Sequence, residues 1–123
     1  MELARRMVDI AKEYNEALLV VERNNHGSGV LALAEQVCGY RRLYRQNDQL
    51  GWLTNSVSRP AMLGRLQAAL VEVPECFQSR RLLTECRSFV RLANGQSGAR
   101  AGCHDDRVMA IAIALAVRAE GSL

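Results

Sequence analysis

Three acidic residues, Glu22, Asp105 and Asp106, occupy positions from which a folded chain could hold a cation. Glu22 ends the apolar run ALLVVE, and strand ends of open α/β sheets are where ligand-binding groups gather. Asp105 and Asp106 begin a strongly apolar helix, where one aspartate suffices as a cap and a second adds repulsion unless a cation lies between them. Carboxylates are the ligands of Mg²⁺ and Mn²⁺, which in pairs hydrolyse phosphodiester bonds. These residues therefore predict a divalent-cation site.

Each acidic position also has an ordinary structural explanation. Glu22 can emerge into solvent or pair with an arginine, and the aspartates can stabilise the positive end of a helix dipole. Three polar neighbours are auxiliary candidates: His104, which could orient a water or bind a metal, and Asn24 and His26 in the turn after the strand. Turn chemistry explains Asn and Gly there without any functional role, so both interpretations stay open.

A cluster of arginines offers a second kind of chemistry. Arg41, Arg42 and Arg45 lie close together in the sequence and could contact DNA phosphates. A solvated charged face explains them equally well. The net charge of +3, from 16 basic and 13 acidic residues, permits nucleic-acid binding without requiring it.

The pattern of apolar residues predicts helices alternating with short strands. Leu3, Met7, Ile10 and Tyr14 recur at spacings of three and four, with Ala4 and Ala11 beside them, which predicts an amphipathic helix. The expected helices are 2–15, 28–37, 58–72, 79–86 and 104–119, and the expected strands are 17–22, 40–45, 50–54, 89–92 and 99–101. This alternation predicts an α/β fold with a mixed sheet, in one domain over residues 1–123. Ser58 and Ser79 are expected helix caps, residues 46–49 an expected polar turn, and Asn94-Gly95 an expected hairpin turn. The last helix is apolar on almost every face, so we expect it to be buried on most sides.

Composition narrows the class of protein. A chain of 123 residues with a hydrophobic fraction of 49% suits one globular core. The four cysteines, Cys38, Cys76, Cys86 and Cys103, form no CxxC pair, so we expect free thiols and no zinc ribbon. The charged N-terminus is no signal peptide, and the longest apolar stretch, VMAIAIALAV, is too short to cross a bilayer. We therefore expect a location in the cytoplasm of a host cell and no membrane partner.

A series of short strings carries a family resemblance. In order, VVERNNHG (20–27), RRLY (41–44), GWLTN (51–55), SRPAML (58–63), LLTECRSFV (82–90) and GCHDDRVMAIAIA (102–114) resemble the nuclease domain of phage terminase large subunits. The resemblance covers nearly all of the chain from about residue 17. VVERNNHG, GWLTN and HDDRVMA are its most specific strings.

The resemblance implies an RNase H-like fold and a metal-dependent endonuclease that cuts double-stranded DNA during phage genome packaging. It implies that Glu22, Asp105 and Asp106 are metal ligands and catalytic residues for Mg²⁺ or Mn²⁺. Which aspartate of the pair is the main ligand stays open, with Asp105 slightly favoured.

The sequence also departs from the family pattern. The family's first metal-binding aspartate lies in strands preceding the helix that here spans residues 2–15, and this sequence begins at that helix. No Walker-type GxxxxGK[ST] string of an ATPase domain occurs. We therefore expect a partial RNase H-like fold, its N-terminal strands missing, with weakly bound or absent metal and impaired nuclease activity.

Two further expectations follow from this departure. Loss of a neighbouring strand would expose the edge of strand 17–22, which predicts a homo-oligomer that covers it. Two alternatives to the nuclease stay open: a catalytically inactive prophage remnant that acts at most as a self-associating interaction module, and generic arginine-mediated binding of nucleic acid. The sequence is therefore consistent with either an active or an inactive nuclease.

Overall fold

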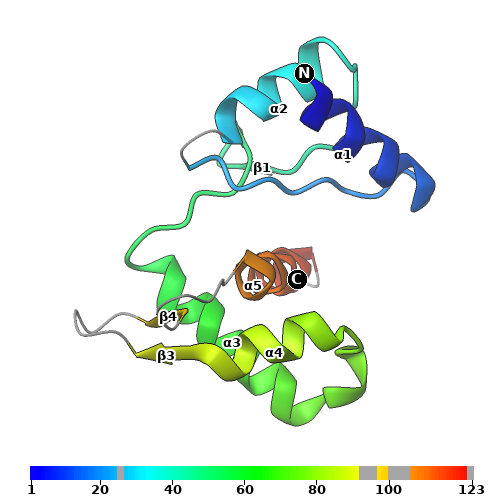
Figure 1. Ribbon diagram of the computed structural model, residues 1–123. Coiled ribbons are helices and arrows are strands. Elements are labelled where there is room, and N and C mark those ends of the chain that lie inside the picture. The colour runs from blue at the N-terminus through cyan, green and yellow to red at the C-terminus, as the bar shows by residue number, and fades with distance from the viewer. Residues whose placement is uncertain (25–26, 92–96, 100–105, 122–123) are drawn as a thin grey trace. The chain divides into compact units, whose positions relative to one another are not determined.

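The protein is a mixed α/β chain that is mostly helical, as a computed structural model shows (Figure 1). The structure describes residues 1–24, 27–91, 97–99 and 106–121. The chain divides into two compact units, Met1–Ser56 and Val57–Leu123. The predicted single domain over residues 1–123 stays a prediction.

The first unit contains two helices and a short hairpin. Its elements are α1 (Glu2–Glu13), α2 (Gly27–Gln36), β1 (Arg45–Gln46) and β2 (Gln49–Leu50). β1 and β2 pair antiparallel, and the two turn residues between them, Asn47 and Asp48, have φ values of 52° and 67°. Positive φ at both central residues is the geometry of the tight turns that join hairpin strands. The predicted polar turn at 46–49 is confirmed.

The predicted strand 17–22 is an extended segment with two isolated parallel bridges. Leu19 pairs with Leu43 and Glu22 pairs with Trp52. Between residues 43 and 52 of the partner segment, the chain forms the β1–β2 hairpin, whose strands pair with each other and not with segment 17–22. The hydrogen bond from Gly51 N–H to Tyr44 C=O, at 2.8 Å, closes the base of this hairpin. The expected strands at 40–45 and 50–54 are therefore two pieces of one interrupted partner, because the hairpin occupies the residues that would continue the pairing.

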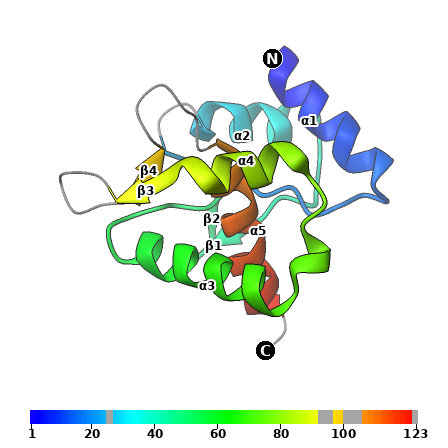
Figure 2. The same cartoon turned by 60° about the horizontal axis from the view of Figure 1, so that its bottom comes forward.

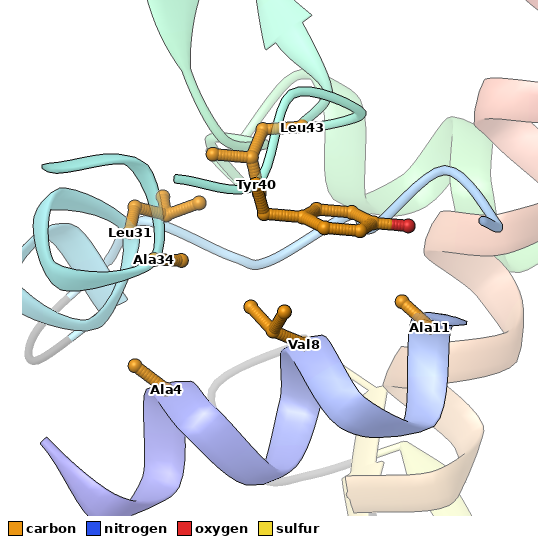
Figure 3. Close-up of a cluster of buried hydrophobic side chains, with 7 residues drawn as sticks. All are labelled: Ala4, Val8, Ala11, Leu31, Ala34, Tyr40 and Leu43. Carbon is orange, nitrogen blue, oxygen red and sulfur yellow. The ribbon is translucent and has the colours of Figure 1, made fainter. Parts of the chain in front are cut away.

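The core of the first unit lies between the two helices and the extended segments. Figure 3 shows Ala4, Val8 and Ala11 of α1 on one side of the helix, facing Tyr40 and the residues of α2. They are 1%, 2% and 5% exposed, whereas Leu3, Ile10 and Tyr14 are largely exposed. The helix is amphipathic, as predicted, but its small residues face the core. Alanines let α1 approach α2 closely, and larger side chains would hold the two helices apart.

The described residues of the second unit form three α-helices and a short hairpin. Its elements are α3 (Ser58–Glu72), the 3₁₀ turn η1 (Pro74–Cys76), α4 (Arg80–Ser88), β3 (Phe89–Arg91), β4 (Ser97–Ala99) and α5 (Asp106–Gly121). α3 and α4 both pack against α5, as Figure 2 shows. The predicted cap at Ser79 is confirmed, because its hydroxyl accepts from Leu82 N–H at 3.2 Å. The predicted cap at Ser58 is wrong: Val57 precedes α3 and offers no side-chain hydrogen bond.

The expected hairpin near the end of the chain is present in part. β3 and β4 pair antiparallel with Val90 opposite Gly98, and the intervening turn lies outside the described residues. Within the described ranges the sheet structure consists of two separate two-stranded antiparallel sheets plus the parallel bridges, and it is therefore smaller than the mixed sheet that we expected. Among the described residues, none of the helices combines the length and the apolar character that a membrane-spanning helix needs.

Helix α5 is less buried than its composition predicts. Val108, Ala112 and Ile113 are buried, while Ala110 and Ala114 are exposed. Most other apolar positions of α5 are half-buried, and the exposed positions Arg107, Ala110, Ala114 and Arg118 lie on one stripe, so the expected burial on most sides is met only in part. Alanine raises the apolar count of a helix but is tolerated at the surface.

Candidate functional site

Glu22 lies in the extended segment 18–23, at the second of its two parallel bridges, the one with Trp52. Its bridge to Trp52 is flanked by two hydrogen bonds, from Trp52 N–H to Val21 C=O at 2.9 Å and from Arg23 N–H to Trp52 C=O at 2.8 Å. Residues paired in a bridge point to the same face. Position 54, two residues after Trp52, therefore faces the same way as Glu22.

The Glu22 carboxylate is held on one side only. Its Oε2 accepts a hydrogen bond from the Thr54 hydroxyl. Its Oε1 has no hydrogen-bond partner among the residues that the structure describes. A half-buried carboxylate oriented in this way has one oxygen whose direction is set and a second that can bind a ligand.

Asn24 continues the pairing of this segment with its side chain. Its amide Nδ2–H donates to Thr54 C=O at 3.0 Å, and its Oδ1 accepts from Thr54 N–H at 3.2 Å. The two bonds satisfy both backbone groups of Thr54, as a neighbouring strand would. Asn24 was predicted as an auxiliary site residue, and here it fixes the residue that orients Glu22.

Two glycines allow the backbone to pass close to this site. A Cβ at Gly27, where α2 begins, would lie 1.8 Å from Glu22 C=O. A Cβ at Gly51 would lie 2.7 Å from Val21 C=O, and the φ of Gly51 is +89°. Any side chain at position 27 would displace the start of α2, so the turn 23–27 and the position of Glu22 are coupled.

The start of α5 has a capping carboxylate that the sequence did not predict. Glu85 of α4 accepts from the backbone N–H groups of Arg107 at 2.8 Å and Val108 at 3.3 Å, and its Oε2 bonds the Arg107 guanidinium at 2.6 Å. The hydrogen bond from the Arg107 side chain is the main reason that the pKa of Glu85 is lowered; burial opposes that effect. Both carboxylate oxygens of Glu85 are therefore used in binding the N-terminus of α5 and the Arg107 side chain, and Glu85 serves as a structural cap.

The predicted acidic pair is described in part. Asp106 is exposed in the first turn of α5. Asp105, His104 and His26 lie outside the described residues. Glu22 belongs to the first unit and Asp106 to the second.

The predicted DNA-contacting arginines are all exposed. Arg41 and Arg42 have their side chains in solvent, and the carbonyl of Arg42 accepts from Leu19 N–H at 2.8 Å. Arg45 forms an ion pair with Glu35 of α2, so its guanidinium already has an anionic partner. Arg41 and Arg42 are consequently the better placed of the three for phosphate contacts.

The structure thus brings Glu22, Asn24 and Thr54 together. Thr54 is the functional candidate that the sequence analysis did not single out, although it lies in the quoted string GWLTN. Oxygen donors of this kind suit Mg²⁺ or Mn²⁺. Among the described residues, however, no group of three or more acidic, histidine or cysteine side chains could by itself hold a metal ion.

Comparison with known proteins adds no relative. Neither the protein-family models nor the curated proteins give a match to this chain. Any functional assignment therefore depends on the residues and their local geometry.

Proposed function

We propose that the chain is a terminase-like, metal-dependent DNA endonuclease with an RNase H-like fold. Its proposed metal ligands and catalytic residues are Glu22, Asp105 and Asp106. The observation that supports this most is the geometry of Glu22, a carboxylate at the end of an extended segment, with one oxygen oriented by Thr54. Two of the most specific strings of the resemblance, VVERNNHG and GWLTN, supply both residues of this pair.

The local structure around Glu22 fits the role of a ligand better than that of a solvated surface group. Asn24 and Thr54 form a bidentate backbone contact, and Gly27 permits the close turn behind Glu22. These contacts restrict the carboxylate before any ion binds, which reduces the entropy lost on binding. A bound Mg²⁺ or Mn²⁺ would supply Lewis-acid activation of water and of the phosphate.

The proposed substrate is double-stranded DNA. Arg41 and Arg42 are exposed on a segment that pairs with the strand leading to Glu22, so phosphate contacts there would lie within the same unit as the carboxylate. Binding through such contacts should weaken steeply with added salt. A second copy of the chain is the other proposed partner.

A nicking assay on supercoiled plasmid with Mn²⁺ tests the proposal. The nicking activity of the wild-type chain is expected to be weak, and it should be lost in Glu22→Gln, which keeps the size and the hydrogen bond from Thr54 but removes the charge. The matched control is Glu13→Gln, an exposed carboxylate at the end of α1. Nicking that persists in Glu22→Gln, or in EDTA, would refute the metal-dependent mechanism. No nicking at a protein concentration that binds Mn²⁺ would favour the inactive remnant.

A further inference from the structure

Helix α1 and its C-cap residue Tyr14 carry a second apolar surface that their own unit does not cover. Leu3, Ile10 and Tyr14 are 58%, 55% and 72% exposed, and Met7 between them is half-buried. We call these four residues the α1 stripe. Single exposed apolar side chains are common, but four aligned on one helix mark a surface for association.

The spacing of the α1 stripe is that of a two-heptad coiled-coil seam. Its members follow one another at four, three and four residues, which is the alternation of the a and d positions. At about 100° per residue they fall on one line, and the buried face of α1 lies roughly a quarter-turn away. The helix therefore has a face of small residues for its own core and a separate face of large residues.

The charges beside the α1 stripe match a second copy of the same helix. Arg6 and Glu13 are both exposed and border the stripe on the side away from the core. They occupy equivalent positions two turns apart, so they are too distant to pair within one helix. In an antiparallel pair of α1 helices, Arg6 of each copy faces Glu13 of the other. A parallel pair does not bring them together.

We propose that the α1 stripe is the contact between two copies of this chain, with their α1 helices antiparallel about a two-fold axis. The same patch serves both copies, as closed symmetric dimers require. This inference does not depend on nuclease activity. It also differs from the homo-oligomer expected through segment 17–22, where Leu18 and Val20 offer only a short backbone edge.

The expected affinity is modest. A helix of 12 residues is about 18 Å long, so the contact is smaller than the roughly 1,600 Å² of a standard stable interface. We expect a dissociation constant of about 10 μM or weaker, which places the dimer within reach of analytical ultracentrifugation at high protein concentration.

A charge-exchange experiment tests the antiparallel pairing. Arg6→Glu and Glu13→Arg each set two like-charged pairs across the contact, so each variant alone should dimerise about tenfold more weakly or worse. Mixing the two variants should restore dimers, since every pair across the mixed contact is then opposite in charge. The double variant Arg6→Glu/Glu13→Arg should also recover wild-type dimerisation.

Two controls make the result specific to this surface. Asp9→Lys changes an exposed charge on the far side of α1 and should leave the dimer intact. Val20→Lys alters segment 17–22. The inference is overturned if the wild-type chain is monomeric at several hundred micromolar, if mixing does not restore dimers, or if Val20→Lys alone abolishes them.

Discussion

The close approach at Gly51 offers a test of how the segment bearing Glu22 is held. Gly51→Ala and Gly39→Ala form a matched pair, because both glycines are in the first unit with positive φ, +89° and +65°. A Cβ at position 39 would have nothing within 4 Å. A Cβ at position 51 would lie 2.5 Å from Leu31 Cδ1 and 2.7 Å from Val21 C=O. The two variants therefore share the backbone cost and differ in the steric cost.

The size of each effect follows from these contacts. A side chain in the left-handed region costs about 1–2 kcal/mol, which is the whole loss expected for Gly39→Ala. Gly51→Ala adds overpacking of about 1–3 kcal/mol, because Leu31 is 1% exposed and cannot move aside into solvent. Val21 C=O is also fixed, since it accepts from Trp52 N–H. We therefore expect a total loss of about 2–5 kcal/mol for Gly51→Ala.

Urea unfolding, followed by the fluorescence of the single tryptophan and by circular dichroism, measures both losses. Gly29→Ala is a further control, because its Cβ would meet open space within α2 and should stabilise the protein by about 0.5–1 kcal/mol. Equal losses in Gly51→Ala and Gly39→Ala would refute the packing that we describe around segment 18–23.

Three further predictions concern the α1 core, the cap of α5 and the thiols. Val8→Ala should lower the free energy of unfolding by about 1–3 kcal/mol, whereas Ile10→Ala, at an exposed position, should change it by about 0.5 kcal/mol or less. Urea titration measures both changes, and a larger loss in Ile10→Ala than in Val8→Ala would contradict the assigned core. Because the pKa of Glu85 is lowered, its carboxylate stabilises the fold at pH values above the ordinary carboxyl pKa, and this stabilisation is lost as the pH falls through the lowered pKa. The difference in free energy of unfolding between the wild type and Glu85→Gln should therefore shrink in acid. A difference that does not change between pH 7 and 3 would exclude this cap. Burial, and to a smaller extent the charge of Glu85, raises the pKa of the Cys86 thiol. In single-cysteine variants, a maleimide at pH 7 should therefore label the exposed Cys76 faster than Cys86, and faster labelling of Cys86 would contradict the structure.

Much of the helical structure could be predicted from the sequence. Ser58 to Glu72 reads as a helix from its apolar positions and its early proline, and Pro74 marks where the next turn begins. The cap at Ser79 and the turn at Asn47 and Asp48 follow from local chemistry, which depends on few neighbours.

The faces of the helices could not be predicted in the same way. The size of apolar side chains favoured Leu3 and Ile10 as the core face of α1, but α1 packs through Ala4 and Ala11, because alanine permits close approach. Which face is buried depends on the partner helix, and periodicity alone does not encode that partner.

The candidate site was predictable only at its centre. Glu22 and Asn24 stand out because a polar turn follows an apolar run. Thr54 lies 32 residues further along, and its contact with Glu22 depends on a long-range pairing that the intervening hairpin interrupts. Glu85 caps a helix 22 residues away, and nothing in its own neighbourhood in the sequence indicates that role.

Mn²⁺ binding to the chain, measured by calorimetry, tests the central proposal most directly. We predict that Glu22→Gln and Asp106→Asn each weaken binding at least about tenfold, whereas Glu13→Gln leaves it unchanged, because ion affinity depends on the number and charge of oxygen ligands. A wild-type chain that binds no Mn²⁺ at millimolar concentration, or binding unaffected by Glu22→Gln, would contradict the proposed role of Glu22.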